Sequence, residues 1–230
     1  MELLLTAATA LEIEPVCHWL GREEQPGVYL HGDHRIRVLI SGAGILRTTY
    51  HLTRWLMDYP CDLAIQAGIA GSFREEFLPG TVFAVEKEIL GDTGAGDGPV
   101  FRDLFDIGLA GKNDPPFRDG MLINPLGRVA GPWEPTGLDW AKGITVNKVT
   151  GDPQTVRNLV EKYDPDLETM EGAAFHFVCL LKPVPFLQVR AISNYAGHRN
   201  RESWDIPIAC RNLHQALIPI LENPGGLDLT

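Results

Sequence analysis

The chain has 230 residues, 44% of them hydrophobic, and carries a formal net charge of −10 at pH 7. A chain of this length buries enough apolar surface to fold without a disulfide or a metal ion. Because acidic residues outnumber basic ones, neither nucleic acid nor an anionic membrane surface is an expected partner.

The sequence carries no targeting or metal-binding signal. No apolar run reaches the length of a membrane span and the N-terminus has no basic leader, which predicts a cytoplasmic protein. The cysteines and histidines lack metal-type spacing, so we expect neither a metal site nor a cofactor.

Strand and helix patterns alternate through the N-terminal half. The apolar run "ELLLTAA" predicts a strand, and "LEIEPVCHWL" directly after it predicts a short helix. A strand over residues 34–41 is followed by "GAG" and by a helix over residues 45–59. The run "DLAIQAGIAG" predicts a buried strand that ends in glycines, and "TVFAVEKEIL" predicts another strand.

The alternation resumes in the C-terminal half after an irregular stretch. Residues 91–140 are rich in Gly, Pro and Asp, which predicts long loops with one short helix near Phe101–Phe105. "GITVNKVTG" predicts a strand, residues 152–163 predict a helix, and a further helix begins near Glu171. "PFLQVRAIS" is the last predicted strand, and a helix over residues 203–222 follows it.

Buried strands separated by helices predict an α/β fold, formed by one domain over residues 1–230. In such folds, ligands bind outside the carboxyl ends of the strands. Four predicted strands end in glycine or polar residues, in "TAATALE", "SGAG", "QAGIAGS" and "RAISNYAG". Glycine lets backbone approach a ligand, so these segments together predict a binding site. A dinucleotide fingerprint is a weak alternative, because "GAGILR" lacks the third glycine.

Segments from most of the chain resemble the purine nucleoside phosphorylase and nucleosidase superfamily. "ETMEGAA", "VPF" and "RAISN" match its C-terminal half, "DLAIQAGIAGS" its glycine-rich strand, and "LLLTAATALE" its first strand and catalytic turn. Within the superfamily, the chain resembles the methylthioadenosine/S-adenosylhomocysteine nucleosidases and, most closely, the futalosine hydrolases. The resemblance implies a three-layer αβα sandwich with a central mixed, mostly parallel sheet, and a homodimer or larger homo-oligomer.

The resemblance implies roles for four residues in breaking an N-glycosidic bond. Hydrolysis needs an activated water on one side of the sugar and a stabilised purine on the other. Glu12 aligns with the family's general base, although it also suits the first turn of a helix and Glu14 lies two residues away. Glu171 aligns with the glutamate that holds the ribose hydroxyls, with Met170 beneath the sugar. Arg190 aligns with an arginine that orients the water, or else it forms a structural ion pair.

Two positions depart from the family pattern. Asn194 stands where adenine-releasing nucleosidases carry an aspartate that protonates the base at N7. An asparagine offers an N–H donor, which matches the O6 acceptor of a 6-oxopurine. Asn194, supported by Ser193, therefore predicts a 6-oxopurine nucleoside. Ile69 stands where the family often has a serine that contacts the water, so either backbone groups of Gly68 and Ala70 take over or the water is held differently.

Together, the residues and the resemblance predict a small-molecule nucleoside substrate and hydrolysis of futalosine to hypoxanthine and dehypoxanthine futalosine, in menaquinone biosynthesis. No arginine set that matches a phosphate pocket lies beside "SGAG" or "GIAGS". Three alternatives stay open: a 6-oxopurine nucleoside phosphorylase, a methylthioadenosine or aminodeoxyfutalosine nucleosidase, and an inactive nucleoside-binding protein. The benzoate carboxylate of futalosine needs a cation, for which Arg199 and Arg201 are candidates and Arg47 is the competitor.

Overall fold

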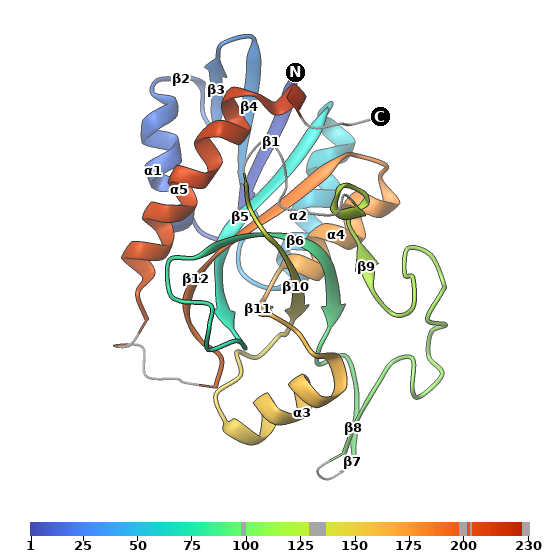
Figure 1. Cartoon of the computed structure of the whole chain (residues 1–230). Coiled ribbons are helices and arrows are strands. Elements are labelled where there is room, and N and C mark those ends of the chain that lie inside the picture. The colour runs from blue at the N-terminus through green and yellow to red at the C-terminus, as the bar shows by residue number, and fades with distance from the viewer. Residues whose placement is uncertain (98–99, 129–136, 198–201, 203, 227–230) are drawn as a thin grey trace.

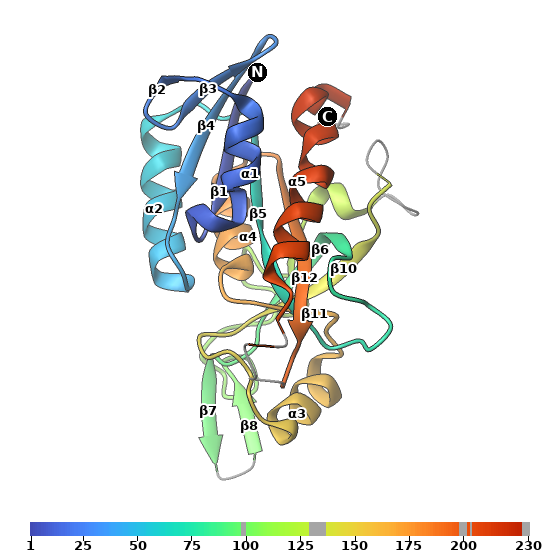
Figure 2. The same cartoon turned by 90° about the vertical axis from the view of Figure 1, so that its left-hand side faces the viewer.

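A mixed sheet forms the core of the protein, and helices cover both of its faces (Figures 1 and 2). One face carries α1 (Ala10–Leu20) and α5 (Ile206–Glu222). The other carries α2 (Ile45–Asp58) and α4 (Gly172–Leu181). The expected three-layer αβα arrangement is therefore confirmed. The computed structural model describes residues 1–97, 100–128, 137–197, 202 and 204–226.

The strands of the main sheet follow the order β11-β10-β6-β12-β5-β1-β4-β3-β2. Their bounds are β1 Glu2–Ala7, β2 Glu23–Gln25, β3 Val28–His31, β4 His34–Ile40, β5 Leu63–Ser72, β6 Val82–Leu90, β10 Trp140–Thr145, β11 Leu167–Thr169 and β12 Phe186–Tyr195. β5 runs parallel to β1 and β12, whereas β6 runs antiparallel to β12. β11 also pairs with β5, in antiparallel orientation. The carboxyl end of β5 is therefore flanked by β11 on one side and β12 on the other.

β5 and β12 form the centre of the sheet because their sequences are apolar on both faces. Leu63 and Ile65 of β5 pack in one core cluster with Leu187 and Val189 of β12. Strands that helices cover on both faces need such continuous apolar sequence. Both strands become polar at their carboxyl ends, where ligands bind in sheets of this kind.

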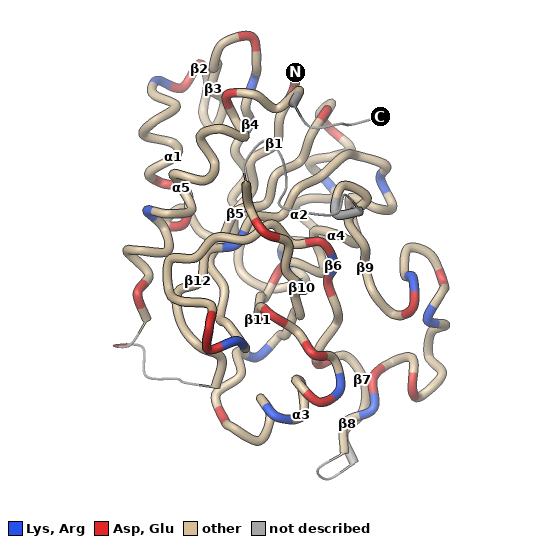
Figure 3. The backbone as a smooth tube through the Cα atoms, in the orientation of Figure 1, with Lys and Arg blue, Asp and Glu red and all other residues tan. Residues whose placement is uncertain are grey.

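The stretch 91–140 contains a hairpin where the sequence predicted a helix. β7 (Gly94–Asp97) pairs antiparallel with β8 (Val100–Asp103), so the helix expected near Phe101–Phe105 is wrong. Lys162 of α3 (Pro153–Tyr163) forms an ion pair with Asp103 at 3.0 Å. Figure 3 shows Lys and Arg in blue and Asp and Glu in red along α3 and the neighbouring hairpin. The pairing with β7 and the ion pair to α3 favour an extended strand over an isolated helical turn. Two short elements follow, β9 (Leu122–Ile123) and the 3-10 helix Pro125–Arg128.

α5 is the longest of the described helices, with 17 residues. It places Leu213 and Leu217 in the core against the sheet. Asp205 caps its N-terminus, because its carboxylate accepts a hydrogen bond from the N–H of Ile208 at 3.0 Å. Among the described residues, no helix is both long and apolar enough to cross a membrane.

Candidate active site

Residues that are distant in sequence meet near the carboxyl ends of β1, β5 and β12. Glu12 lies in the first turn of α1, which follows β1. Arg190 lies on β12 directly opposite Gly68 of β5. Glu171 precedes α4, and its Oε1 accepts a hydrogen bond from the N–H of Gly44, before α2, at 2.9 Å. We call Glu12, Glu171 and Arg190 the carboxylate cluster.

Glu12 is buried, and both of its carboxylate oxygens accept hydrogen bonds. Oε2 accepts from the N–H of Thr9 at 2.8 Å and from its Oγ1 at 2.9 Å. Oε1 accepts from the N–H of Ile69 on β5 at 3.2 Å. Glu12 thus stabilises the first turn of α1 and also reaches the sheet. Glu14, the competing carboxylate, is exposed on the same helix.

Gly68 allows the carboxylate cluster to form. A Cβ atom at this position would overlap Nη1 of Arg190 and would lie 2.9 Å from Oε1 of Glu12. The guanidinium and the carboxylate therefore converge over the bare backbone of Gly68. A larger residue would displace at least one of them, so close packing explains why "QAGIAGS" has a glycine at this position.

Arg190 holds the centre of the cluster although it is only 1% exposed. Its Nη2 donates to Oε1 of Gln66 at 2.7 Å, and its Nη1 lies 3.7 Å from Oε2 of Glu171. Burial raises the pKa of Glu171, while the charge of Arg190 and the N–H of Gly44 act to lower it. The negative charge of Glu12 raises the pKa of Glu171 further. Ligand hydroxyls that donate to Glu171 would favour its charged form.

A β-bulge at Ser193 sets the direction of the Asn194 side chain. Ile192 pairs with Ala70 and Asn194 pairs with Gly71, so Ser193 is an extra residue in the strand. Bulges of this kind bend a strand and re-aim the side chains beside them. Ser193 and Asn194, the polar pair near the end of β12, therefore also change the shape of the strand.

Hydrogen bonds fix the orientation of the Asn194 amide. The Oγ of Ser193 donates to Oδ1 of Asn194 at 2.8 Å, and Nδ2 of Asn194 donates to the carbonyl oxygen of Tyr195 at 3.1 Å. A backbone carbonyl only accepts, so the NH₂ group must face Tyr195. Among the described residues, Nδ2 has this one acceptor, so its second hydrogen can donate to a ligand.

Two further residues that the sequence singled out lie beside the carboxylate cluster. The carbonyl oxygen of Ile69 accepts from Nη1 of Arg190 at 3.4 Å, and its N–H binds Glu12. The backbone of Ile69 therefore forms hydrogen bonds with both Arg190 and Glu12. Met170 is partly buried and directly precedes Glu171 in the chain.

The structure does not test the cations predicted for the far end of the substrate. Arg199 and Arg201 lie outside the described residues. Arg47 is exposed, and its guanidinium folds over the "SGAG" turn, where a Cβ atom on Gly42 would overlap it. The position of a carboxylate-binding group therefore stays a prediction.

The sequence did not single out Glu88, a buried glutamate that packs against Gly172 at the start of α4. Glu88 of β6 is fully buried, and it accepts hydrogen bonds from Thr145 Oγ1 and Gln188 Nε2, each at 2.8 Å. Burial raises its pKa to about 7, against the lowering effect of these donors. A Cβ atom on Gly172 would overlap Oε1 of Glu88, so the first residue of α4 has to be glycine. The glycine in "MEGAA" was the one available sequence signal of this contact.

A second overlooked glutamate lies at the other end of the site. Glu168 of β11 pairs with Gly71 of β5, the residue that also pairs with Asn194. Its Oε1 accepts a hydrogen bond from the N–H of Thr150 at 3.0 Å. Burial raises the pKa of Glu168, and the Thr150 hydrogen bonds act to lower it. Its position in "LETMEGAA" was quoted for the resemblance, but the motif gave Glu168 no separate role.

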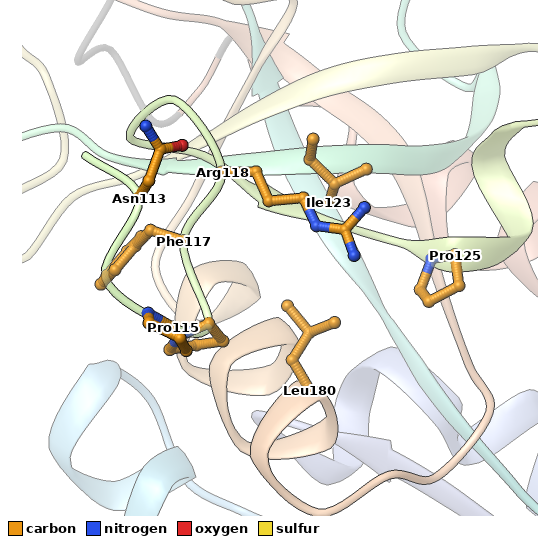
Figure 4. A pocket seen from close by; sticks show the side chains of 8 residues that line it. Asn113, Pro115, Phe117, Arg118, Ile123, Pro125 and Leu180 are labelled. Carbon is orange, nitrogen blue, oxygen red and sulfur yellow. The ribbon is translucent and has the colours of Figure 1, made fainter.

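The residues that line two cavities of the structure include none of Glu12, Glu171 and Arg190. One of about 900 Å³ extends between the β7–β8 hairpin and α3 and reaches Thr150, the partner of Glu168. Another of about 480 Å³ lies at the far end of α4, where Arg118 and Ile123 face Leu180 (Figure 4). Leu180 lies nine positions after Glu171, or about 13 Å further along the helix axis. The first cavity therefore adjoins the Glu168 end of the site, and the second is separate from it.

Comparison with known proteins identifies the family. A family model described as "Phosphorylase superfamily" matches residues 3–222. The chain belongs to this superfamily. It is 31% identical to the futalosine hydrolase of Streptomyces coelicolor, with 97% of each protein covered. It is 29% identical to the futalosine hydrolase of Thermus thermophilus, with 95% of this chain and 92% of that protein covered. The resemblance predicted from the sequence is confirmed.

Solved structures show the same fold at lower identity. The futalosine hydrolase of Helicobacter pylori superimposes with a TM-score of 0.79 at 17% identity, covering 97% of this chain and 98% of that chain. An S-adenosylhomocysteine nucleosidase from Streptococcus pyogenes, solved with 5-methylthiotubericidin, gives a TM-score of 0.78 at 20% identity, with 97% of each chain covered. The nucleoside phosphorylase-like fold expected from the sequence is therefore confirmed.

Proposed function

We propose that the protein is a futalosine hydrolase, which cleaves the N-glycosidic bond of futalosine and releases hypoxanthine and dehypoxanthine futalosine. The observation that carries this proposal is the spacing of two polar groups along β5. The carboxylate cluster surrounds Gly68, and Asn194 lies opposite Gly71. Three strand residues span about 10 Å, which suits a nucleoside with its sugar at Gly68 and its base at Gly71. The similarity to futalosine hydrolases, at 29% and 31% identity over nearly the whole chain, supports the choice of substrate.

The groups around Gly68 suit the sugar and the attacking water. Glu12 takes a proton from the water, and the oxygen of the water forms a bond to C1′ of the ribose. The C1′–N9 bond breaks, and its electron pair passes to the purine, which then takes up a proton from solvent while Glu12 gives its proton back to solvent. Glu171 accepts hydrogen bonds from the two ribose hydroxyls, which suits a carboxylate. Both carboxylates stabilise the positive charge that develops on the sugar, while Arg190 holds Glu171 and the Ile69 backbone in place.

Asn194 supports a 6-oxopurine as the leaving group. Its remaining Nδ2 hydrogen donates to the base, where O6 and N7 carry the negative charge of the departing purine. A 6-aminopurine would present an N–H donor at position 6 to the same N–H, and two donors that face each other form no hydrogen bond. The amide orientation set by Ser193 and Tyr195 therefore favours hypoxanthine over adenine as the product.

The proposal is tested by identifying the products with and without phosphate. We expect hypoxanthine from futalosine in phosphate-free buffer, at a rate that added phosphate leaves unchanged. Aminodeoxyfutalosine and methylthioadenosine should react far more slowly, because they carry a 6-amino group. Release of base that requires phosphate and yields a sugar 1-phosphate would establish the phosphorylase alternative instead. Binding of futalosine without release of base would establish the inactive binding protein.

We also propose that the chain forms a single domain over residues 1–230, that it assembles as a homo-oligomer, and that it is located in the cytoplasm. α2 exposes an apolar stripe of Leu46 (84% exposed), Tyr50 (60%) and Met57 (69%). These residues lie on one helix face. α2 begins directly after Gly44, which binds Glu171, so a second copy on the stripe would lie beside the site. Sedimentation should show a dimer or larger species that Leu46→Glu dissociates, and a monomeric wild-type protein would contradict this.

A further inference from the structure

Three residues form a row across the sheet at the Asn194 end of the site. Gly71 of β5 pairs with Glu168 of β11 on one side and with Asn194 of β12 on the other. Side chains of directly paired residues lie on the same face of a sheet. Glu168 and Asn194 therefore project to one side, with the side-chain position between them left empty by Gly71.

The side-chain position that Gly71 lacks lies between the two polar side chains. A Cβ atom there would lie 3.3 Å from Nδ2 of Asn194, 3.7 Å from Cβ of Glu168 and 3.7 Å from the backbone nitrogen of Ala196. The side of Gly71 that faces this position is therefore bounded by an amide on one flank and a carboxylate stem on the other. A flat group that rests there would meet an N–H donor at one edge and an oxygen acceptor at the other.

Glu168 has one carboxylate oxygen that the described part of the chain leaves without a hydrogen bond. The side chain is 6% exposed, and Oε1 accepts from the N–H of Thr150 at 3.0 Å. Oε2 is buried, and no described residue donates to it. A buried carboxylate oxygen without a donor is costly, so its presence in a native site calls for an explanation. A ligand N–H is the missing partner of the right chemical type.

We propose that Oε2 of Glu168 accepts a hydrogen bond from N1–H of the 6-oxopurine base while Asn194 donates to O6. This inference rests on the proposed function and adds the second residue that selects its base. A 6-oxopurine presents an acceptor at O6 and a donor at the neighbouring N1. A 6-aminopurine presents a donor at the 6-position and an acceptor at N1, which is the reverse pattern. The Glu168–Asn194 pair therefore matches the first base at two points and opposes the second at both.

The electrostatics of the empty site agree with this role. Burial raises the pKa of Glu168, and the negative charge of Asp92 adds to the increase. Hydrogen bonding from the side chain and from the N–H of Thr150 lowers the pKa but offsets this increase only in part. A second donor from the base would favour the charged form of the carboxylate. The base thus supplies the hydrogen bond that the protein leaves open.

The test measures binding of free base to the full-length protein, so it needs no turnover. Calorimetry compares hypoxanthine with 1-methylhypoxanthine, which keeps O6 but has no N1–H. We expect the wild-type protein to bind hypoxanthine more tightly by about 10- to 100-fold, the range for a hydrogen bond to a charged group. In Glu168→Gln, the side-chain carbonyl keeps the Thr150 hydrogen bond and the NH₂ group faces N1–H. The preference for hypoxanthine should therefore fall to near one. Glu76→Gln, at an exposed position, is the matched control and should leave the preference unchanged.

Each outcome bears on the inference separately from the proposed function. A wild-type protein that binds both bases equally would overturn it, even if no Glu168 variant folds. A wild-type preference that Glu168→Gln leaves intact, with an unchanged melting temperature, would also overturn it. If futalosine is not hydrolysed but hypoxanthine binding depends on Glu168, the inference stands and the proposed function fails. If futalosine is hydrolysed and the preference ignores Glu168, the inference alone fails.

Discussion

The two ends of the site differ in how completely the described residues satisfy the carboxylates. At the Gly68 end, both oxygens of Glu12 accept hydrogen bonds, although Nε of Arg190 and Nε2 of Gln66 have no partner among the described residues. At the Gly71 end, Asn194 keeps a free N–H and Glu168 keeps an unpartnered oxygen within the described structure. The carboxylates of the sugar end are thus held in place before a ligand arrives, whereas the carboxylate of the base end is completed by the ligand. This division places catalysis at one end and selection of the base at the other.

Asn194→Asp tests the base end and should have the largest effect. The N–H that faces O6 becomes a carboxylate oxygen, which repels O6 and accepts from a 6-amino group. A site built on such hydrogen bonds discriminates by about 10⁴–10⁵ when the match is broken. We expect kcat/KM for futalosine relative to aminodeoxyfutalosine to fall by a large part of this factor. Asn113→Asp, at an exposed loop position, is the control. An unchanged ratio would mean that Asn194 does not contact the base.

Glu12→Gln tests the sugar end. The amide keeps the size of the side chain but cannot take a proton from water, so kcat should fall by about 10²–10⁴-fold. Binding of free hypoxanthine, measured by calorimetry, should stay within about twofold of wild type, because the base lies three residues further along β5. Glu14→Gln on the same helix should keep full activity. Near-normal turnover by Glu12→Gln would remove Glu12 from the mechanism.

Alanine at each of the two glycines separates the ends directly. A Cβ atom on Gly68 would overlap Nη1 of Arg190, whereas one on Gly71 would approach Nδ2 of Asn194 at 3.3 Å. Displacing a catalytic group by about 1 Å costs on the order of 10²-fold in rate. Gly68→Ala should therefore lower kcat while hypoxanthine still binds, and Gly71→Ala should weaken hypoxanthine binding. Identical losses of both properties in the two variants would show that the site is not divided in this way.

Glu88→Gln probes the support of α4 and should alter stability more than chemistry. The pKa of Glu88 is raised from 4.5 to about 7, so the folded protein holds a proton there that the unfolded chain releases. The free energy of unfolding of wild type therefore decreases as the pH rises from about 4.5 to about 7, by about 3 kcal/mol in total from this group. Gln does not titrate, so the variant should lack this decrease.

Urea unfolding at several pH values measures the Glu88 effect. The difference in unfolding free energy, variant minus wild type, should grow with pH up to about 7 and then stay constant. Any fixed offset reports the rearranged hydrogen bonds to Thr145 and Gln188, so the slope is the test. A difference that is independent of pH would show that Glu88 does not titrate in this range.

The sequence predicted the fold better than it predicted the base end of the site. The continuous apolar runs of β5 and β12 reflect local physics that the pattern of apolar residues can detect. The convergence of Glu12, Glu171 and Arg190 followed from the resemblance, because no local pattern links residues so far apart. The β7–β8 hairpin was missed because its glycines and aspartates look like a loop, and cross-strand pairing decides its structure.

Glu168 and Glu88 were missed for a different reason. In sequence, each looks like an ordinary charged residue in a strand, and only burial distinguishes Glu88 from the neighbouring Glu86. Their significance comes from pairing across the sheet, with Gly71 beside Glu168 and Gly172 over Glu88. Both glycines were visible in the motifs, but the carboxylates that they accommodate lie far away in the chain.

A crystal structure of the protein with hypoxanthine tests the division of the site most directly. The account predicts that the ring lies over Gly71, with Nδ2 of Asn194 about 2.7–3.2 Å from O6 and Oε2 of Glu168 at a similar distance from N1. The carboxylate cluster around Gly68 should keep its present geometry, because the protein already organises it. Hypoxanthine bound instead in the cavity between the hairpin and α3, or with N1 turned away from Glu168, would contradict the account.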